Sequence, residues 1–333
     1  MAQAITVALA TGVAVAINIL KSLTMKNIVV LGGTGFVGAH VCEKLVQQGW
    51  RVTVPTRRAH HAKHIQHLPS LTVQQMDVHD AAALAHVLAG HDAVVNLVAI
   101  LHGSPDAFEK AHVTLPKTLA QACQTAGVRQ VVHISALGVN GRTPDAAPSH
   151  YLRSKGRGEQ ALARAGLNLT ILRPSVIFGA HDQFLNLFAK LQKVFPLMPL
   201  AGADARFQPV WVEDVATSVV RALQLPAAKG AAPRIYEVCG TRVYTLRQLV
   251  QLAAQLSSAQ GRTRPVLSLP MWLGRLQALL MECAPGQPLM SRDNLDSMAV
   301  DNVATGTLPD LHRMGITATA LVPVARGYLA RHL

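Results

Sequence analysis

Cysteine is scarce in this chain of 333 residues, which contains four. The four lie far apart in the sequence and form no C-x-x-C pair: Cys42, Cys123, Cys239 and Cys283. This spacing argues against both a structural zinc site and a disulfide framework. A reducing, cytoplasmic compartment is therefore expected.

Aromatic and acidic residues are also few. Aromatics make up 4% of the chain, and 18 acidic residues face 31 lysines and arginines, which gives a formal net charge of +13 at pH 7. The basic residues are scattered and do not alternate with aromatics, so recognition of nucleic acid is not predicted. An anionic cofactor or an acidic membrane surface accounts for the charge more simply. Half of the residues are apolar, which is enough for a substantial core.

The first residues form an apolar stretch, 4–20, that is open to three interpretations. A secretory signal would carry positive charge before the apolar run, and none is present. A membrane anchor is possible, although the stretch is short and rich in Ala, Thr and Gly. We favour the third interpretation, in which Met25 is the biological start, because Lys26 opens the first strand directly. Residues 1–24 are then expected to lie outside the fold.

A β-branched run, 27–31, leads into glycines spaced G-x-x-G-x-x-G. The run is typical of a strand buried on both faces of a parallel sheet, and helical apolar spacing follows it. The first glycine permits a tight turn, the second lets a pyrophosphate approach the backbone, and the third allows the helix to pack closely. Phosphate would then meet the helix N-terminus. The pattern predicts a dinucleotide site made of Gly32, Thr34, Gly35, Phe36, Val37 and Gly38.

The end of the second expected strand, 50–55, indicates which dinucleotide is bound. Arg57 and Arg58 follow it, where the adenosine ribose should lie, and no acidic residue stands between Arg51 and Met76. An acidic residue there would accept hydrogen bonds from the ribose hydroxyls of NAD, whereas arginine suits a 2′-phosphate. We therefore predict a preference for NADP(H) over NAD(H).

Strand and helix patterns continue to alternate along the chain. Strands are expected at 71–78, 92–99 and 130–135, with helices at 81–88 and 105–126 between them. This alternation predicts an α/β fold with a doubly wound parallel sheet of the Rossmann type.

Two of these strand ends should also line the nucleotide. Asp77 and Val78 end the third strand, where Asp77 could reach the adenine amino group, while Asp80 is the better candidate for a helix N-cap. The fourth strand ends in three residues that would lie beside the cofactor: Leu97, Val98 and Ala99.

Histidine is concentrated between the second and third strands, but no metal site is predicted. Four histidines have helical spacing there: His60, His61, His64 and His67. No carboxylate or cysteine accompanies them, so we expect a solvated surface.

A possible acid/base pair follows the fifth strand. Tyr151 and Lys155 are four residues apart, so on a helix they share one face, and Ser135 ends the strand before them. A lysine ammonium beside the phenol would lower the tyrosine pKa and allow proton transfer near neutral pH. The ammonium could also bind the nicotinamide ribose. We take these three as candidate catalytic residues.

Together these motifs resemble the extended and atypical short-chain dehydrogenase/reductase superfamily. More narrowly, the chain is similar to the branch of the dehydrogenase-like accessory subunit of mitochondrial complex I and its bacterial relatives. The resemblance rests on the segments 32–38, 132–138, 151–155, 172–179 and 207–216 and on the region around Asp77, while 285–295 is similar to bacterial members. It implies that the loop containing Pro174 and Ile177 lies beside the nicotinamide.

Two departures from the superfamily pattern bear on activity. His112 stands in the segment where active members usually carry an asparagine, and Ser135 lacks a preceding serine. The branch also contains members that bind NADP(H) without an established reaction.

The resemblance suggests two unequal lobes. We expect a Rossmann domain over 25–180, to which 207–223 return, and a smaller substrate or partner lobe from 181–206 and 224–333. Apolar helices are expected at 182–200 and 270–283. The second of these would suit either core packing or a membrane-bound partner.

Two functional hypotheses remain. In the first, the protein is an NADP(H)-dependent oxidoreductase or epimerase that acts on a small-molecule or quinone-like substrate through the Tyr–Lys pair. In the second, it is a non-catalytic NADP(H)-binding accessory or assembly protein linked to respiratory complex I or to quinone metabolism. It would be cytoplasmic or associated with the inner face of a membrane.

Overall fold

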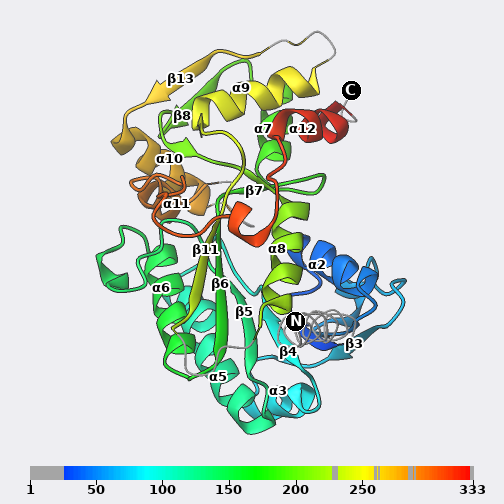
Figure 1. Cartoon of the computed structure of the whole chain (residues 1–333). Helices are drawn as coiled ribbons and strands as arrows, with labels where there is room; N and C mark the ends of the chain where they lie inside the picture. Colours follow the sequence, from blue (N-terminus) through cyan, green and yellow to red (C-terminus); the bar gives the residue numbers. More distant parts are fainter. Residues whose placement is uncertain are drawn as a thin grey trace, which may run out of the picture.

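A seven-stranded parallel sheet forms the centre of the molecule (Figure 1). The computed structural model describes residues 26–226, 232–258, 261, 263–283, 288 and 290–330. The strands of the sheet are β1 (Asn27–Leu31), β2 (Arg51–Thr56), β3 (Leu71–Gln75), β4 (Ala93–Asn96), β5 (Gln130–Ile134), β6 (Asn168–Pro174) and β11 (Arg234–Val238). Their spatial order is β11-β6-β5-β4-β1-β2-β3, and every neighbouring pair is parallel. The predicted doubly wound α/β fold is confirmed.

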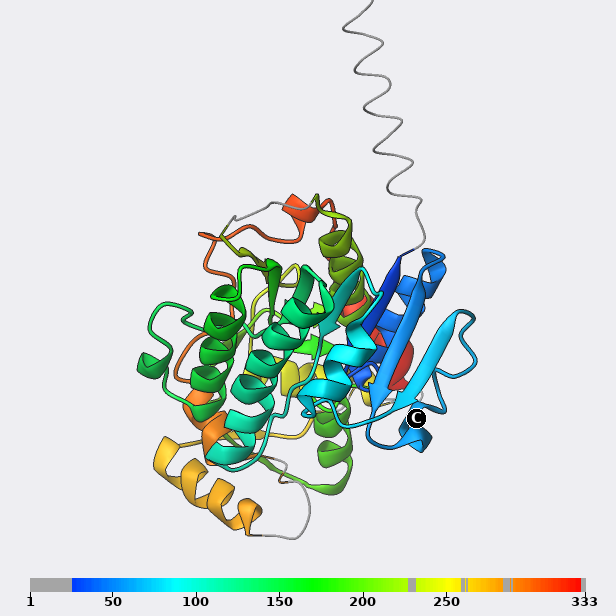
Figure 2. The same ribbon diagram turned by 90° about the horizontal axis from the view of Figure 1, so that it is seen from below.

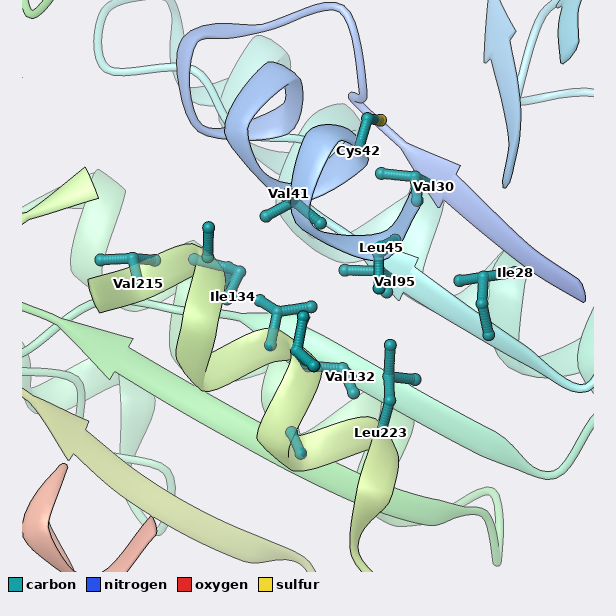
Figure 3. Packing of buried hydrophobic residues seen from close by; sticks show 14 of the residues in the cluster. Ile28, Val30, Val41, Cys42, Leu45, Val95, Val132, Ile134, Val215 and Leu223 are labelled. Carbon is teal, nitrogen blue, oxygen red and sulfur yellow. The ribbon is translucent and has the colours of Figure 1, made fainter. Parts of the chain in front are cut away.

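Helices cover both faces of this sheet, which explains the consecutive valines in its central strands. On one face, α2 (Phe36–Gln47) and α8 (Val212–Gln224) pack on Val30, Val95 and Val132 (Figure 3). On the other face, the strand residues next to these valines pack against α3 (Ala81–Leu88), α5 (Leu115–Ala126) and α6 (His150–Ala163). A polar residue at these positions would be buried on either side.

The strand order reverses between β1 and β4, which are neighbours in the sheet. Their loops leave toward opposite faces, since α2 lies on one side and the segment after β4 leads to α5 on the other. Because the strands are parallel, all their carboxyl ends lie at one edge. In such sheets this edge, at the reversal point, is where ligands bind.

A smaller lobe lies beyond that edge (Figure 1). It contains α7 (Leu185–Val194), β8 (Met198–Ala201), α9 (Leu246–Ser257), β13 (Val266–Leu269), α10 (Met271–Glu282), α11 (Arg292–Ser297) and α12 (Leu321–Leu329). Three two-stranded pairings accompany it: β7 (Ile177–Phe178) with β10 (Val210–Trp211), β9 (Arg206–Phe207) with β12 (Tyr244–Thr245), and β8 with β13. Short 3-10 turns are η1 (Ala59–Ala62), η3 (Pro144–Ala146) and η4 (His312–Met314). No helix in the described part of the chain has the length and apolar character needed to cross a membrane.

The helix expected over 105–126 is interrupted. It consists of α4 (Pro105–Glu109), a π-helical turn η2 (Lys110–Thr114) and α5. Pro116 accounts for the interruption, because it has no N–H to bond the carbonyl of His112 and its ring would press on that carbonyl in a regular helix. Gly158 of α6 then approaches the same carbonyl so closely that an added Cβ would lie 2.0 Å from its oxygen.

Two other expectations at the lobe boundary need correction. β11 lies within 224–333, which we expected in the smaller lobe, but it pairs with β6 in the central sheet. The helix expected over 182–200 is shorter: α7 ends at Val194, Pro196 follows it, and the chain then enters β8, which contains Pro199. The expected N-terminal extension, 1–24, lies outside the described residues.

One buried ion pair joins α6 to the sheet. Arg173 of β6 donates to Glu159 of α6 through both arms of its guanidinium, with Nε–Oε1 at 2.9 Å and Nη2–Oε2 at 2.6 Å. The side chains are 11% and 3% exposed. The two charges therefore compensate each other through two direct hydrogen bonds.

We predict that Arg173→Met lowers the free energy of unfolding by about 3–5 kcal/mol, because it leaves Glu159 as an unpaired buried charge. Urea denaturation followed by circular dichroism measures this. The matched control is Arg206→Met, which breaks an exposed pair with Asp301 and should cost about 1 kcal/mol or less. Equal losses in the two variants would contradict the prediction.

Candidate functional site

The turn between β1 and α2 has the close packing that its glycines predicted. Gly32 has a φ of +80°, and its carbonyl accepts from the Gly35 N–H at 3.0 Å. A Cβ on Gly38 would lie 2.2 Å from the Gly32 oxygen. Gly35 is the N-cap of α2 and provides no side-chain cap. The first-turn N–H groups, which belong to residues after Gly35, thus remain available to an anion.

The end of β4 lies directly against this turn. A Cβ on Gly32 would be 3.2 Å from both the Leu97 carbonyl carbon and the Val98 nitrogen. Leu97 N–H also donates to the Leu31 carbonyl at 2.9 Å. The turn and the predicted cofactor residues 97–99 therefore form one continuous surface at the reversal point of the sheet.

The arginines predicted to select the cofactor follow β2 and are exposed. The Thr56 hydroxyl holds the backbone of Arg58, with Oγ1 3.2 Å from its carbonyl and 3.4 Å from its nitrogen. Within the described residues neither Arg57 nor Arg58 forms an ion pair with a carboxylate. Their guanidinium groups remain free to bind an anion.

The two aspartates after β3 differ in what they contact. Asp80 caps α3 by accepting from the Ala82 and Ala83 N–H groups, as predicted. Asp77 accepts through Oδ1 from the His79 N–H at 3.1 Å, which orients its carboxylate at the end of the strand next to Val78.

Helix α6 brings Lys155 to the end of β5. The ammonium is buried and donates to the Ile134 carbonyl at 3.0 Å, one residue before Ser135. Burial lowers the pKa of Lys155 to about 8, against the opposing effect of Glu159. Tyr151, one turn earlier, packs edge-on against the ring of His112 with centroids 5.5 Å apart.

The predicted effect of Lys155 on Tyr151 is wrong. The pKa of Tyr151 is raised to about 12, first by burial and then by the nearby carboxylate of Asp293. A buried phenol loses the hydration that its charged form needs, and this outweighs any attraction from the ammonium. Tyr151 is therefore a protonated hydroxyl at neutral pH and is suited to donate a proton.

Ser135 lies at the meeting point of β5 and β6. Its N–H donates to the Leu172 carbonyl at 2.8 Å, and Leu137 N–H donates to the Pro174 carbonyl at 2.9 Å. The Ser135 hydroxyl is buried and has no hydrogen-bond partner within the described structure. Ile177 follows in β7, which continues this edge toward the smaller lobe.

His112 supports Tyr151 through a defined hydrogen-bond chain. Its Nε2 accepts from the Ile100 N–H at 3.0 Å, so the proton is on Nδ1, which donates to the Ser154 hydroxyl at 2.9 Å. Ser154 in turn donates to the Tyr151 carbonyl at 2.8 Å. Burial lowers the pKa of His112 to about 2, with Lys155 contributing, so the imidazole is neutral.

A second neutral histidine lies inside the sheet and was not singled out from the sequence. The Asn96 Oδ1 accepts from the Val98 N–H at 3.2 Å, so its amide nitrogen faces His133 Nδ1 at 3.2 Å and donates to it. The proton of His133 is therefore on Nε2, which is buried without a partner in the described structure. Burial, with Lys155, lowers the pKa of His133 to about 3.

The smaller lobe contributes Asp293, also missed as a contact. The carboxylate of Asp293 in α11 accepts from the His150 N–H at 2.6 Å and the Tyr151 N–H at 3.1 Å. Ser149 caps the same turn through Leu152 N–H and is bonded by Ser297. Two residues of α11 therefore hold the first turn of α6.

Known proteins that are similar in sequence show the family to which this chain belongs. Residues 32–184 match the NAD(P)H-binding family. The chain is 30% identical over 311 residues to the mitochondrial NADH dehydrogenase (ubiquinone) 1 alpha subcomplex subunit 9 of Mus musculus, and the alignment covers 91% of this chain and 79% of that protein. The chain belongs to the family of this complex I subunit.

Two further proteins are less similar in sequence. The Caulobacter vibrioides ceramide reductase is 27% identical over 239 residues, covering 71% of this chain and 72% of that protein. A nucleoside-diphosphate-sugar epimerase of Staphylococcus aureus has the same fold, with a TM-score of 0.68, 17% identity and coverage of 91% and 99%. The chain thus contains an NAD(P)H-binding domain and has the fold of this epimerase.

The neutral state of His133 predicts a pH-dependent stability. Its pKa is about 3 in the folded protein and about 6.5 when unfolded, so between these values the unfolded chain binds more protons and stability falls as pH falls. From pH 7 to pH 5 the loss from this group is about 2 kcal/mol.

Urea denaturation of the wild type and of His133→Gln at the two pH values measures the effect. The variant should lose about 2 kcal/mol less than the wild type between them. His64→Gln, which changes an exposed histidine, is the control and should follow the wild type. A wild-type loss that His133→Gln does not reduce would refute the assignment.

Proposed function

We propose that this protein is an NADP(H)-dependent oxidoreductase that reduces a carbonyl or quinone group. The observation that carries the proposal is a buried ammonium, Lys155, beside the unpartnered hydroxyl-bearing residue Ser135 at the end of β5. The protonated phenol of Tyr151 lies one turn before Lys155 on α6. Kinship with the protein named ceramide reductase supports reduction as the reaction class. Epimerases share the fold alone.

The residues fit a dinucleotide cofactor. The glycine turn leaves no space for a Cβ at Gly38, and the uncapped start of α2 offers N–H groups to a pyrophosphate. The predicted contacts Thr34, Phe36 and Val37 belong to this turn and the first turn of the helix, and Leu97 and Val98 lie against the turn. We expect Asp77, Val78 and Ala99 to complete the contacts with the cofactor. We expect Pro174 and Ile177 to lie beside the nicotinamide, with Lys155 at its ribose.

The bound cofactor would supply the hydride. The chain would then provide the proton, because Tyr151 holds one at neutral pH and a forming alkoxide is a stronger base than its phenolate. Ser135 would orient the substrate oxygen with its free hydroxyl. Lys155 would add positive charge close to the developing negative charge.

We predict that NADPH binds more tightly than NADH, because Arg57 and Arg58 can form charge-assisted hydrogen bonds to a 2′-phosphate. The preference should be about 1.5–3 kcal/mol, which is about 10- to 150-fold in dissociation constant. Nicotinamide fluorescence titration measures it, and Arg57→Ala with Arg58→Ala should abolish it. Arg51→Ala is the matched control, since it removes an exposed arginine from the other end of β2. Equal wild-type affinities would overturn the assignment.

The role of Tyr151 separates the two functional hypotheses. Tyr151→Phe keeps the ring packing against His112 but removes the proton, so the rate of NADPH oxidation should fall about 10²- to 10⁴-fold while NADPH affinity stays unchanged. Lys155→Met should weaken NADPH binding. Both are assayed with a panel of ketones and quinones, and Tyr236→Phe in β11 is the control. A Tyr151→Phe variant as fast as wild type would exclude proton transfer.

A second candidate function is a non-catalytic accessory role in a respiratory complex. The likeness to a complex I subunit over 91% of the chain favours it. In that case the wild type would oxidise NADPH with no substrate of the panel, yet would melt several degrees higher with NADPH bound. The same assays therefore distinguish the two roles.

A further inference from the structure

Helix α10 buries its small residues and exposes its large apolar ones. Its buried positions are small, since Gly274 and Ala278 pack against Ala201 and Leu295, and a Cβ on Gly274 would lie 2.2 Å from the Ala201 Cβ. Large apolar residues occupy the opposite, outer side. A helix attached to a folded domain normally shows the reverse, with its polar residues outside.

The outer residues form a continuous apolar surface, which we call the α10 face. Trp272, Leu276 and Leu280 are four residues apart and are 66%, 50% and 66% exposed. Because side chains four apart lie on one side of a helix, the three form a line along its length. Met271 and Leu279 flank this line and are also exposed. Figure 2 shows α10, in yellow-orange, at the outer edge of the molecule.

The charge around the α10 face favours an anionic partner. The segments 183–206, 242–283 and 290–297, the last of which contains α11 packed on α10, contain nine lysines and arginines and four acidic residues. Arg264 before β13 is exposed, and Arg275 of α10, with a side chain that is 59% exposed, pairs with Asp296 of α11. A second copy of this chain would bring like charges together. An anionic bilayer offers an apolar interior to the α10 face and negatively charged headgroups to the lysines and arginines around it.

We propose that the α10 face docks this protein on the surface of an anionic phospholipid bilayer. The helix would lie in the plane of the membrane, with Trp272 at the level of the headgroups and Leu276 and Leu280 toward the acyl chains. Its 12 residues span about 18 Å, which suits a surface-bound helix and is too short to cross a bilayer. The proposal does not depend on the cofactor chemistry.

Trp272 provides a built-in reporter for the test. Of the three tryptophans, Trp50 is 2% exposed and Trp211 is partly buried, whereas Trp272 is exposed. The full chain is mixed with vesicles containing phosphatidylglycerol and phosphatidylcholine in about equal parts, or phosphatidylcholine alone. We expect sedimentation with the anionic vesicles, weakened by salt, together with a blue shift of tryptophan emission. Trp272→Phe should bind but lose the shift.

Leu280→Glu should weaken partitioning about tenfold or more, because it places a charge in the apolar line. Ala82→Glu, which adds the same charge to an exposed position of α3, is the matched control and should bind as wild type. Melting curves verify that both variants are folded. Residues 1–24 are present in every variant, so they cannot produce the difference.

Three outcomes would overturn the proposal. One is the absence of binding to anionic vesicles. Another is a contact elsewhere on the molecule. It would show as binding without a blue shift, or as vesicle binding that Leu280→Glu and Ala82→Glu weaken equally. The third is a dimer, detected by light scattering, that Leu280→Glu dissociates, while added vesicles leave the tryptophan emission unchanged. A second copy of the chain would then cover the α10 face.

Discussion

The close approach of α2 to the turn after β1 determines the rest of the dinucleotide half. A Cβ on Gly38 would lie 2.2 Å from the Gly32 oxygen, so only glycine lets the helix start this close to the strand end. The start of α2 is thereby placed at the point where the strand order reverses and the loops after β1 and β4 diverge. Helix N–H groups, strand ends and the free arginines after β2 then share one edge because all seven strands are parallel.

The other half of the site depends on one buried cation. Burial depresses the pKa of both His112 and His133, and Lys155 depresses them further, so these imidazoles remain neutral hydrogen-bonding groups. The Glu159 carboxylate favours the charged lysine but is itself held by Arg173. Tyr151 stays protonated because burial and then the Asp293 carboxylate raise its pKa to about 12, so its hydroxyl can act as an acid only toward a group that becomes strongly basic.

Local chemistry explains what was predictable from the sequence. The glycine turn, the Asp80 cap and the shared face of Tyr151 and Lys155 each depend on residues within one turn of one another. The pairing of Asn96 with His133 depends on the register of β4 and β5 across 37 positions, and the pKa of Tyr151 depends on burial by distant elements. β11 was missed because an edge strand containing arginine and glutamate lacks the apolar run of a central strand.

Helix α11 connects the smaller lobe to the first turn of α6, which contains Tyr151. Leu295 of α11 packs on α10, while Asp293 accepts from the N–H groups of His150 and Tyr151. A carboxylate at a helix N-terminus satisfies donors that have no partner in the helix and interacts favourably with its dipole, and loss of such a cap costs about 0.5–2 kcal/mol. A shift of α11 would uncap the turn that carries the phenol. The position of α10 and the position of Tyr151 are therefore set by the same short helix.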